Sequence, residues 1–251
     1  MQAITSFRQA DLAHCSTAGA AKNRTRIGSV VLPQFSPMRL GIRREPFDHP
    51  DWLYELKYDG FRALAFIESG SCRLVSRKAH VYQSFPSLCA SLAQLPHDAI
   101  LDGEIVCLDQ EGHPQFDELF RHHEQPYFAA FDIPHLDHRD LRDLPLIERK
   151  KELRRVVQRS DSRQLLYVSH IEGQGVALFQ EVCRRDLEGI VVKWKHGPYV
   201  TGDETSWEKI KNPMYSQMIG RWDHLQRKRV GRESYTNAVS VAPRDSSAKQ
   251  G

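Results

Sequence analysis

Residues 52–62 read WLYELKYDGFR, and this stretch sets the pattern for the rest of the chain. Residues 52–58 predict a β-strand, which the turn signal Asp59-Gly60 ends. Lys57 therefore lies at the end of a strand and beside a tight turn, where its position is rigid. A lysine is a nucleophile only when it is neutral, and burial or neighbouring cations favour the neutral form. Taken alone, the pattern Lys-x-Asp-Gly is more often a surface lysine before a hairpin turn.

Outside this stretch, predicted strands come in adjacent runs with a few helices between them. The expected strands are 61–68, 71–76, 99–108, 126–131, 165–170, 189–193 and 206–210, and the expected helices are 85–95, 146–157 and 175–184. Residues 99–108 form either two strands broken at Asp102-Gly103 or one strand with a bulge. Adjacent strands favour an α+β fold of largely antiparallel sheets flanked by helices over a regular βαβ alternation.

The composition is that of an ordinary soluble globular protein, with 40% hydrophobic and 27% charged residues among 251. No run of 18 or more apolar residues occurs, so neither a transmembrane helix nor a membrane partner is expected. The five cysteines contain no Cys-x-x-Cys pair, which argues against a zinc or redox motif and fits a cytoplasmic location. A net charge of +3 permits a nucleic-acid partner without arguing for one.

Three segments are expected along the chain. Residues 1–28 are polar and poor in pattern, which predicts a flexible N-terminal arm. Residues 29–220 hold the periodic apolar pattern and predict the folded domain. Residues 221–251 are basic and poor in apolar residues, which predicts a disordered tail.

Short polar motifs follow several of the predicted strands. Arg77 in Ser-Arg-Lys offers a planar fork for phosphate or ribose oxygens. Glu104 in Asp-Gly-Glu could reach a ribose hydroxyl or a divalent metal, and Phe131 ends an apolar strand where it could stack on a purine. Each motif alone is more often structural: an exposed acid in a hairpin, or an aromatic side chain in the core.

Two further motifs lie near the end of the predicted domain. Glu188-Gly189 opens an apolar strand that ends in Lys193. Lys209 and Lys211 are two residues apart on a strand, so both side chains point to the same face. Two ammonium groups on one face repel each other, and the arrangement suits an anion such as a phosphate.

In chain order, the motifs K-x-D-G, S-R-K, D-G-E-I-V, F-D, E-G-I-V-V-K and W-x-K-x-K resemble those of the covalent nucleotidyltransferase superfamily. This superfamily contains DNA ligases, RNA ligases and mRNA capping enzymes. The phrases around 52–62 and 206–220 are most similar to bacterial ATP-dependent DNA ligases of the end-joining type. The resemblance implies an adenylation domain with an ATP-grasp-like nucleotidyltransferase fold.

The resemblance also implies residue roles. By this resemblance, AMP would be transferred from ATP to the nucleophile Lys57, with Mg²⁺ or Mn²⁺, and then to nicked or broken duplex DNA. Glu55 would lie at the adenine edge. The implied catalytic residues are Lys57, Asp59, Lys209 and Lys211; the implied ATP-binding residues are Glu55, Arg62, Arg77, Glu104, Phe131 and Lys193; the implied metal ligands are Glu188 and Glu104.

One departure from the family pattern bears on sealing. Only 40 residues follow Lys211, whereas such ligases usually continue into an OB-fold domain of about a hundred residues; an absent OB-fold is therefore expected. Two alternatives to a sealing enzyme stay open. One is a module that binds DNA ends or a partner ligase without turnover, and the other is an RNA ligase or capping-type nucleotidyltransferase. Proteins of DNA end joining are the expected protein partners.

Overall fold

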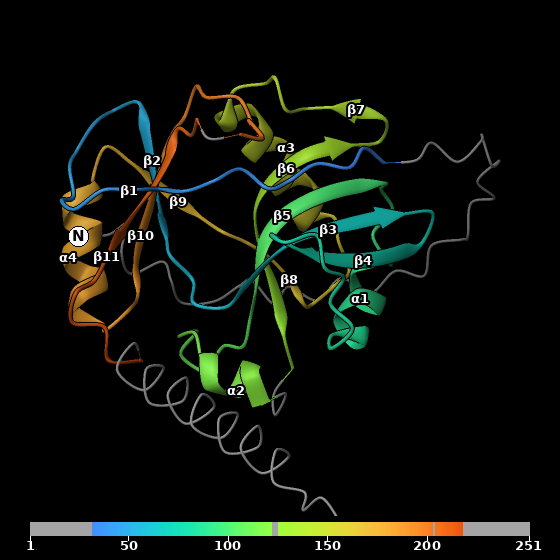
Figure 1. The fold of residues 1–251 in the computed structure, drawn as a ribbon, viewed down its shortest axis with the longest axis horizontal. Helices are drawn as coiled ribbons and strands as arrows, with labels where there is room; N and C mark the ends of the chain where they lie inside the picture. Colours follow the sequence, from blue (N-terminus) through green and yellow to red (C-terminus); the bar gives the residue numbers. More distant parts are fainter. Residues whose placement is uncertain (1–31, 122–124, 203, 218–251) are drawn as a thin grey trace, which may run out of the picture. The chain divides into compact units, whose positions relative to one another are not determined.

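The structure is a computed structural model, and it describes residues 32–121, 125–202 and 204–217. The arm predicted for 1–28 and the tail predicted for 221–251 lie outside these residues. Eleven strands and four helices form in the described part of the chain, arranged in two sheets (Figure 1).

The first sheet gathers strands from both ends of the described sequence. Its spatial order is β1 (Gly41–Ile42), β11 (Trp207–Lys211), β10 (Gly189–Trp194), β2 (Trp52–Leu56) and β9 (His170–Glu172). Helix α4 (Gly175–Arg184) packs on it, because its apolar stripe of Leu178 and Val182 meets Tyr54 and Ile190 in one core.

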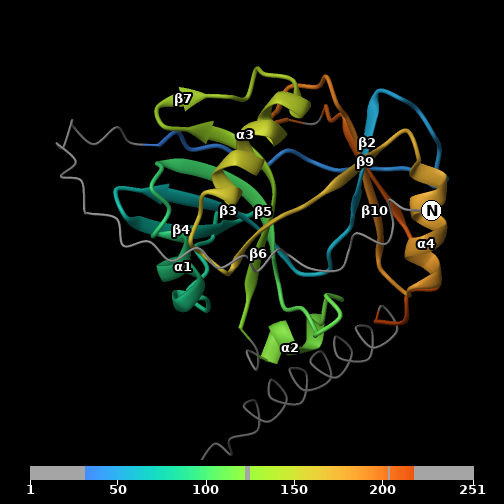
Figure 2. The ribbon, with the colours of Figure 1, turned by 180° about the vertical axis from the view of Figure 1, so that it is seen from behind.

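The second sheet comes from the middle of the sequence. Its order is β4 (Ser71–Ser76), β3 (Phe61–Glu68), β5 (Ala99–Val106), β6 (Tyr127–Leu136) and β7 (Arg139–Asp140), with β8 (Leu165–Tyr167) also paired to β6. Two helices, α1 (Pro86–Leu92) and α3 (Leu146–Gln158), bury their apolar sides in its main core; Figure 2 shows α3 lying along this sheet. Helix α2 (Phe116–Arg121) adds the buried Leu119 to that core.

The predicted fold class is confirmed. The β1–β11 and β6–β8 pairings are parallel, and the other strand pairings among the described residues are antiparallel. No helix in this part of the chain is long and apolar enough to cross a membrane.

The Asp59-Gly60 turn connects the two sheets instead of forming a hairpin. Strand β2 belongs to the first sheet and β3 to the second, so residues 57–60 cross from one to the other. A Cβ atom on Gly60 would lie 2.1 Å from the carbonyl oxygen of Ile105, so only glycine allows this close crossing.

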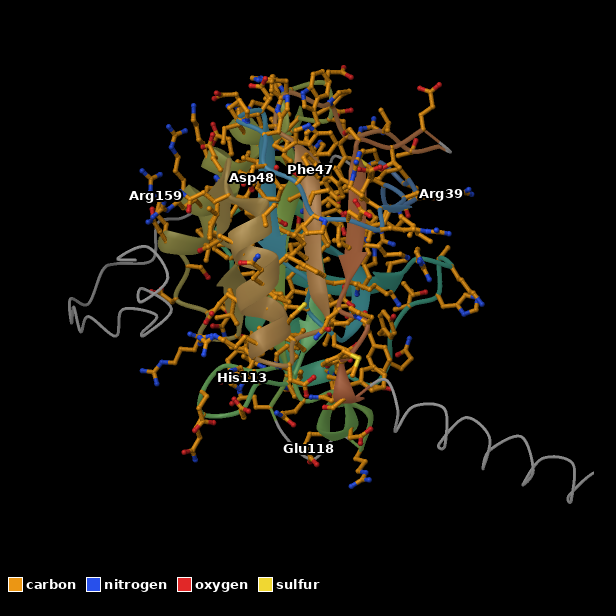
Figure 3. All side chains as sticks on the ribbon, turned by 90° about the vertical axis from the view of Figure 1, so that its left-hand side faces the viewer. Arg39, Phe47, Asp48, His113, Glu118 and Arg159 are labelled. Atoms are coloured by element: carbon orange, nitrogen blue, oxygen red, sulfur yellow. The ribbon has the colours of Figure 1, made fainter. Side chains whose placement is uncertain are left out.

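The segment before β2 is fixed to α4. Asp48 Oδ1 accepts a hydrogen bond from the Val176 backbone N at 2.9 Å, at the start of a helix whose N-cap residue, Gln174, makes no side-chain capping hydrogen bond (Figure 3). The ring of Phe47 meets those of Trp52 and Tyr54 edge-on. These contacts hold the start of β2 in place.

Several predicted boundaries were wrong. Residues 165–170 are not one strand: β8 joins the second sheet in parallel, and after Val168 and Ser169 the chain enters β9 of the first sheet. The strand predicted to end at 131 continues to Leu136. The strand predicted to end at 108 ends at Val106; of the two alternatives for this range, one strand with a bulge is confirmed, because β5 is continuous and its register shifts around Asp102. The short elements β1, β7 and α2 were not predicted.

Candidate active site

A pocket opens where the two sheets meet, beside residues 57–60. Its empty volume is about 440 Å³, with the open mouth included. It is lined by Leu40, Glu55, Leu56, Lys57, Tyr58, Arg62, Glu104, Phe131, Val191, Lys193 and Trp207. Six of the predicted site residues therefore line this pocket: Glu55, Lys57, Arg62, Glu104, Phe131 and Lys193.

Lys57 is held at both its backbone and its side chain. Its backbone N donates to the Gly189 carbonyl oxygen at 3.0 Å, just beyond the end of β2. Its Nζ donates to Glu188 Oε2 at 2.6 Å, and the Glu188 side chain is only 5% exposed. The start of β10 thus fixes the lysine that follows β2.

Gly189 brings Glu188 close to the neighbouring strand. Its φ is +149°, and a Cβ atom there would lie 2.2 Å from the Ile210 carbonyl oxygen. Asn212 N donates to the Glu188 carbonyl oxygen at 2.9 Å and continues the contact between the two strands. Any side chain at position 189 would collide with β11, which explains why glycine follows Glu188.

Glu104 faces Lys57 from the second sheet. Burial raises the pKa of Glu104 to about 8, the nearby Lys57 and Arg62 oppose this rise, and the Glu188 carboxylate adds to it. The carboxyl groups of Glu104 and Glu188 are therefore close enough to interact with each other and with Lys57. A bound cation would stabilise the charged forms of both carboxylates.

The two acids fit a divalent metal that also binds phosphate. Among the described residues, no group of three or more His, Cys, Asp or Glu side chains could hold a metal alone. Mg²⁺ is commonly bound by one or two carboxylates together with phosphate oxygens and water. Glu104 and Glu188 meet that requirement once a nucleotide supplies the phosphates.

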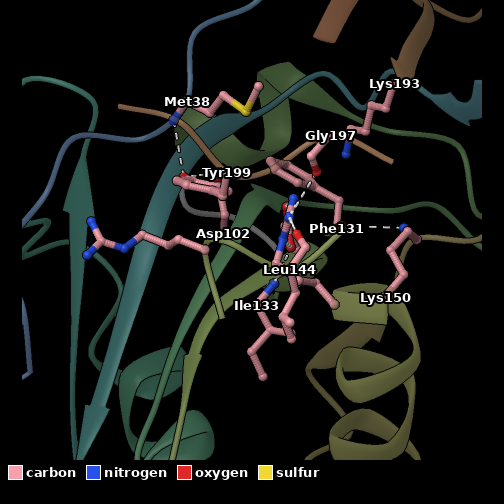
Figure 4. A network of polar contacts seen from close by, with 12 residues as sticks. Met38, Asp102, Phe131, Ile133, Leu144, Lys150, Lys193, Gly197 and Tyr199 are labelled. Carbon is pink, nitrogen blue, oxygen red and sulfur yellow. Dashed lines mark hydrogen bonds and ion pairs between the residues drawn. The ribbon is translucent and has the colours of Figure 1, made fainter. Parts of the chain in front are cut away.

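Arg62 is oriented by a buried carboxylate. Its Nε and Nη2 donate to the two oxygens of Asp102 at 3.1 and 2.7 Å, and Asp102 is fully buried. The Tyr199 hydroxyl donates to Asp102 Oδ2 at 2.7 Å and accepts from the Met38 backbone N at 3.1 Å. Figure 4 shows Met38, Tyr199 and Asp102 in this network. The guanidinium is thereby fixed at the pocket wall.

Glu55 lies between two lysines inside the wall. Its oxygens are each 2.5 Å from an ammonium nitrogen, Oε1 from Lys150 Nζ and Oε2 from Lys193 Nζ. All three side chains are at most 2% exposed. Lys193, one of the implied ATP-binding residues, is thus buried in the pocket wall and paired with Glu55.

Two aromatic rings form the apolar side of the pocket. Phe131 and Trp207 meet edge-on with centroids 5.9 Å apart. Lys193 Nζ lies 4.2 Å from the Phe131 centroid and 4.1 Å from that of Trp207, within cation–π range. A planar ring entering here would find aromatic surface on one side and charge on the other.

Lys209 and Lys211 lie on β11, outside the pocket lining. The pKa of Lys209 is lowered, first by burial and then by the positive charges of Lys211, Lys57 and Arg77. The charges of Lys57, Arg77 and Lys211 are therefore near enough to Lys209 to repel its charge, although Arg77 directly follows β4 in the other sheet. A phosphate group would relieve their mutual repulsion.

Asp59 lies inside the crossing segment. It is 3% exposed, and its Oδ2 accepts from the Tyr215 hydroxyl at 3.1 Å. The contact joins the turn after Lys57 to the segment that follows β11.

Comparison with known proteins identifies the family. Residues 42–211 match the family model described as the ATP dependent DNA ligase domain. The chain belongs to the ATP-dependent DNA ligase family. Every predicted site residue, from Glu55 to Lys211, falls within the matched part of this ligase domain.

Several relatives have similar sequences. The Multifunctional non-homologous end joining protein LigD of Pseudomonas aeruginosa is 30% identical over 199 residues, which are 76% of this chain and 24% of that protein. The SPbeta prophage-derived DNA ligase-like protein LigB of Bacillus subtilis is 29% identical over 192 residues, 73% of this chain and 70% of that protein. The ligase domain thus spans about a quarter of the LigD relative.

A solved structure shares the fold. The mycobacterial DNA ligase D complexed with ATP and MES superposes with a TM-score of 0.64 at 28% identity, over 70% of this chain and 60% of that one. The predicted kinship with end-joining ligases is therefore confirmed.

Sequence reasoning missed four residues that shape the pocket of the ligase domain: Asp102, Lys150, Tyr199 and Trp207. Asp102 and Trp207 stand inside the quoted motifs, so their neighbours were a signal. Lys150 and Tyr199 belong to no motif. Lys150 lies in a charged amphipathic helix, and only the fold shows that its side chain is buried.

Proposed function

We propose that this ligase domain adenylates Lys57 with ATP and uses the adduct to seal DNA breaks. The observation that carries the proposal is the Lys57–Glu188 contact at the pocket, with Glu104 and Arg62 facing it from the other sheet. In its neutral form, Lys57 Nζ would attack the α-phosphorus of ATP and release a proton, forming a P–N bond while the P–O bond to the β-phosphate breaks and pyrophosphate leaves. The AMP group would then pass to a DNA 5′-phosphate, and a 3′-hydroxyl would expel AMP.

The proposed roles follow from charge and position. Nucleotidyl transfer requires alignment and neutralisation of the charge that builds on the phosphate. Arg62, Lys209 and Lys211 provide positive charge, and Glu188 orients the Lys57 amine through the 2.6 Å contact. Mg²⁺ or Mn²⁺ held by Glu104 and Glu188 would supply further positive charge to the phosphates.

The proposal also covers the DNA substrate, the protein partners and the cellular location. Duplex DNA with a nick or break is the proposed substrate, and proteins of end joining are the proposed partners, because a LigD relative carries end joining in its name. The cytoplasmic location stays a prediction from the cysteine pattern.

The test is incubation with α-labelled ATP and Mg²⁺, followed by a denaturing gel. The wild-type chain should carry a label that is acid-labile and base-stable, as a P–N bond is, and Lys57→Ala should carry none. Lys151→Ala, an exposed lysine on α3, is the matched control and should label normally. Equal labelling of Lys57→Ala would refute the assignment of the nucleophile.

The same assay separates the alternatives. Labelling by GTP in place of ATP would move the chain to the capping branch. A labelled protein that never transfers AMP to nicked DNA would favour a module without sealing activity. Transfer and sealing of a labelled nicked duplex would support the complete proposal.

A further inference from the structure

Lys150 is a buried lysine that has no role in the proposed adenylation reaction. It belongs to α3 and is 1% exposed, yet it does not belong to the pocket lining. Its Nζ donates to Glu55 Oε1 at 2.5 Å, to the Val168 carbonyl oxygen at 2.9 Å and to the Phe131 carbonyl oxygen at 3.4 Å. Figure 4 shows Lys150 reaching from the helix towards Phe131. Three acceptors saturate the ammonium and fix it.

The fixed ammonium in turn fixes Glu55. Burial opposes the charged form of this carboxylate, but Lys150 and Lys193 outweigh it, so the pKa of Glu55 is lowered. Each carboxylate oxygen carries two lone pairs. Lys150 donates to one oxygen and Lys193 forms an ion pair with the other, so Glu55 stays an ionised acceptor with lone pairs left for a further donor.

The surroundings of Glu55 suit the edge of a flat heterocycle. Phe131 and Trp207 supply ring surface in the same pocket, which Lys57, the proposed nucleophile two residues along from Glu55, also lines. A carboxylate can accept from an exocyclic amino group, as at position 6 of adenine. It repels a carbonyl oxygen at that position, as in guanine, and gains nothing from a bare C–H.

We propose that Lys150 is a positioning residue that holds Glu55 as the acceptor for a 6-amino group, and so determines the nucleobase preference of lysine adenylation. The inference rests on the proposed function. Lys150 acts from behind the wall and touches no substrate atom. Its effect therefore falls on discrimination between bases.

The experiment compares initial rates of lysine labelling with ATP and with purine riboside triphosphate, which lacks the 6-amino group. The measured quantity is the ratio of kcat/KM values, which does not depend on the folded fraction because both substrates meet the same enzyme. A hydrogen bond to a charged acceptor predicts a wild-type preference for ATP of about tenfold to a hundredfold. Lys150→Met should bring this ratio close to one.

The control is Lys151→Met. This neighbour on α3 pairs with Glu148 at 2.7 Å, and its side chain is 56% exposed. It should keep the wild-type ratio. A Lys150→Met protein with the wild-type ratio would overturn the proposal, as would a wild-type enzyme that labels equally with both triphosphates. Failure of the wild type to label with any nucleoside triphosphate would instead refute the proposed function.

A double variant covers the case in which Lys150→Met does not fold. Glu55→Gln with Lys150→Met removes both charges of the buried pair, which is milder than leaving one alone. If Lys150 acts through Glu55, this double variant should show the same ratio as Glu55→Gln. A further change in the ratio would mean that Lys150 acts independently, and would overturn the proposal.

Discussion

Replacing Arg149 by methionine should strongly destabilise the fold. Arg149 Nε and Nη2 donate to the two oxygens of Asp132 at 2.9 and 2.8 Å, and both side chains are 0% exposed. Its Nη1 donates to the carbonyl oxygens of Leu144 and Gly197 at 2.5 and 3.1 Å. Arg149→Met would leave a carboxylate and two carbonyls without these donors in the interior.

The expected loss is about 3–5 kcal/mol of unfolding free energy, the usual cost of removing one partner of a buried ion pair. Urea unfolding followed by circular dichroism measures it. Arg155→Met on the same helix is the control: Arg155 pairs with Glu152 at 3.0 Å but is 61% exposed. Its loss should stay below about 1 kcal/mol.

A double variant tests the reason for the loss. Adding Asp132→Leu to Arg149→Met removes the stranded charge, so the pair should cost less than Arg149→Met alone by at least about 1 kcal/mol. If Arg149→Met costs under about 1 kcal/mol, or if the two substitutions simply add, then the buried pair is not what joins α3 to β6.

Other substitutions address the site and the pH response. Glu188→Ala and Lys211→Ala should each slow adenylation by about two to three powers of ten, measured as initial labelling rates, with native circular dichroism. Tyr199→Phe removes the hydroxyl that donates to Asp102 and should cost about 1–2 kcal/mol in urea unfolding. Burial, together with Lys150, lowers the pKa of His170 to about 4, whereas the unfolded chain protonates it near pH 6.5. Stability should therefore fall as pH drops from about 6.5 to 4, and His170→Gln should flatten that slope.

Long periodic segments could be predicted from the sequence alone. The expected ranges 61–68, 71–76 and 175–184 coincide with β3, β4 and α4, because each has a complete apolar pattern between turn signals. The separation of β8 from β9 could not be predicted. Residues 165–170 have one continuous strand pattern, and their distribution over two sheets depends on partners distant in the sequence.

The candidate site could be predicted as a set of residues but not as a geometry. The motifs pointed to six of the residues that line the pocket, and they also pointed to Lys209 and Lys211, which lie outside the lining. Nothing local showed that Glu55 would lie between two buried lysines, because Lys150 is 95 positions away in the sequence. The same holds for Arg62, whose partner Asp102 looked like part of a turn.

Because the chain crosses between the two sheets at Asp59-Gly60, the proposed reactive centre contains residues of two separately hydrogen-bonded sheets. Lys57 is attached to the first sheet, whereas Glu104 and Arg62 belong to the second. A shift of about 1 Å between the two sheets could lower the rate of adenylation about a hundredfold while the backbone hydrogen bonds within each sheet stay intact. Circular dichroism would not detect that misalignment, whereas labelling of Lys57 would. A nucleotide that touches both surfaces acts as a clamp, so its binding should slow hydrogen exchange in residues 57–60 more than within either sheet.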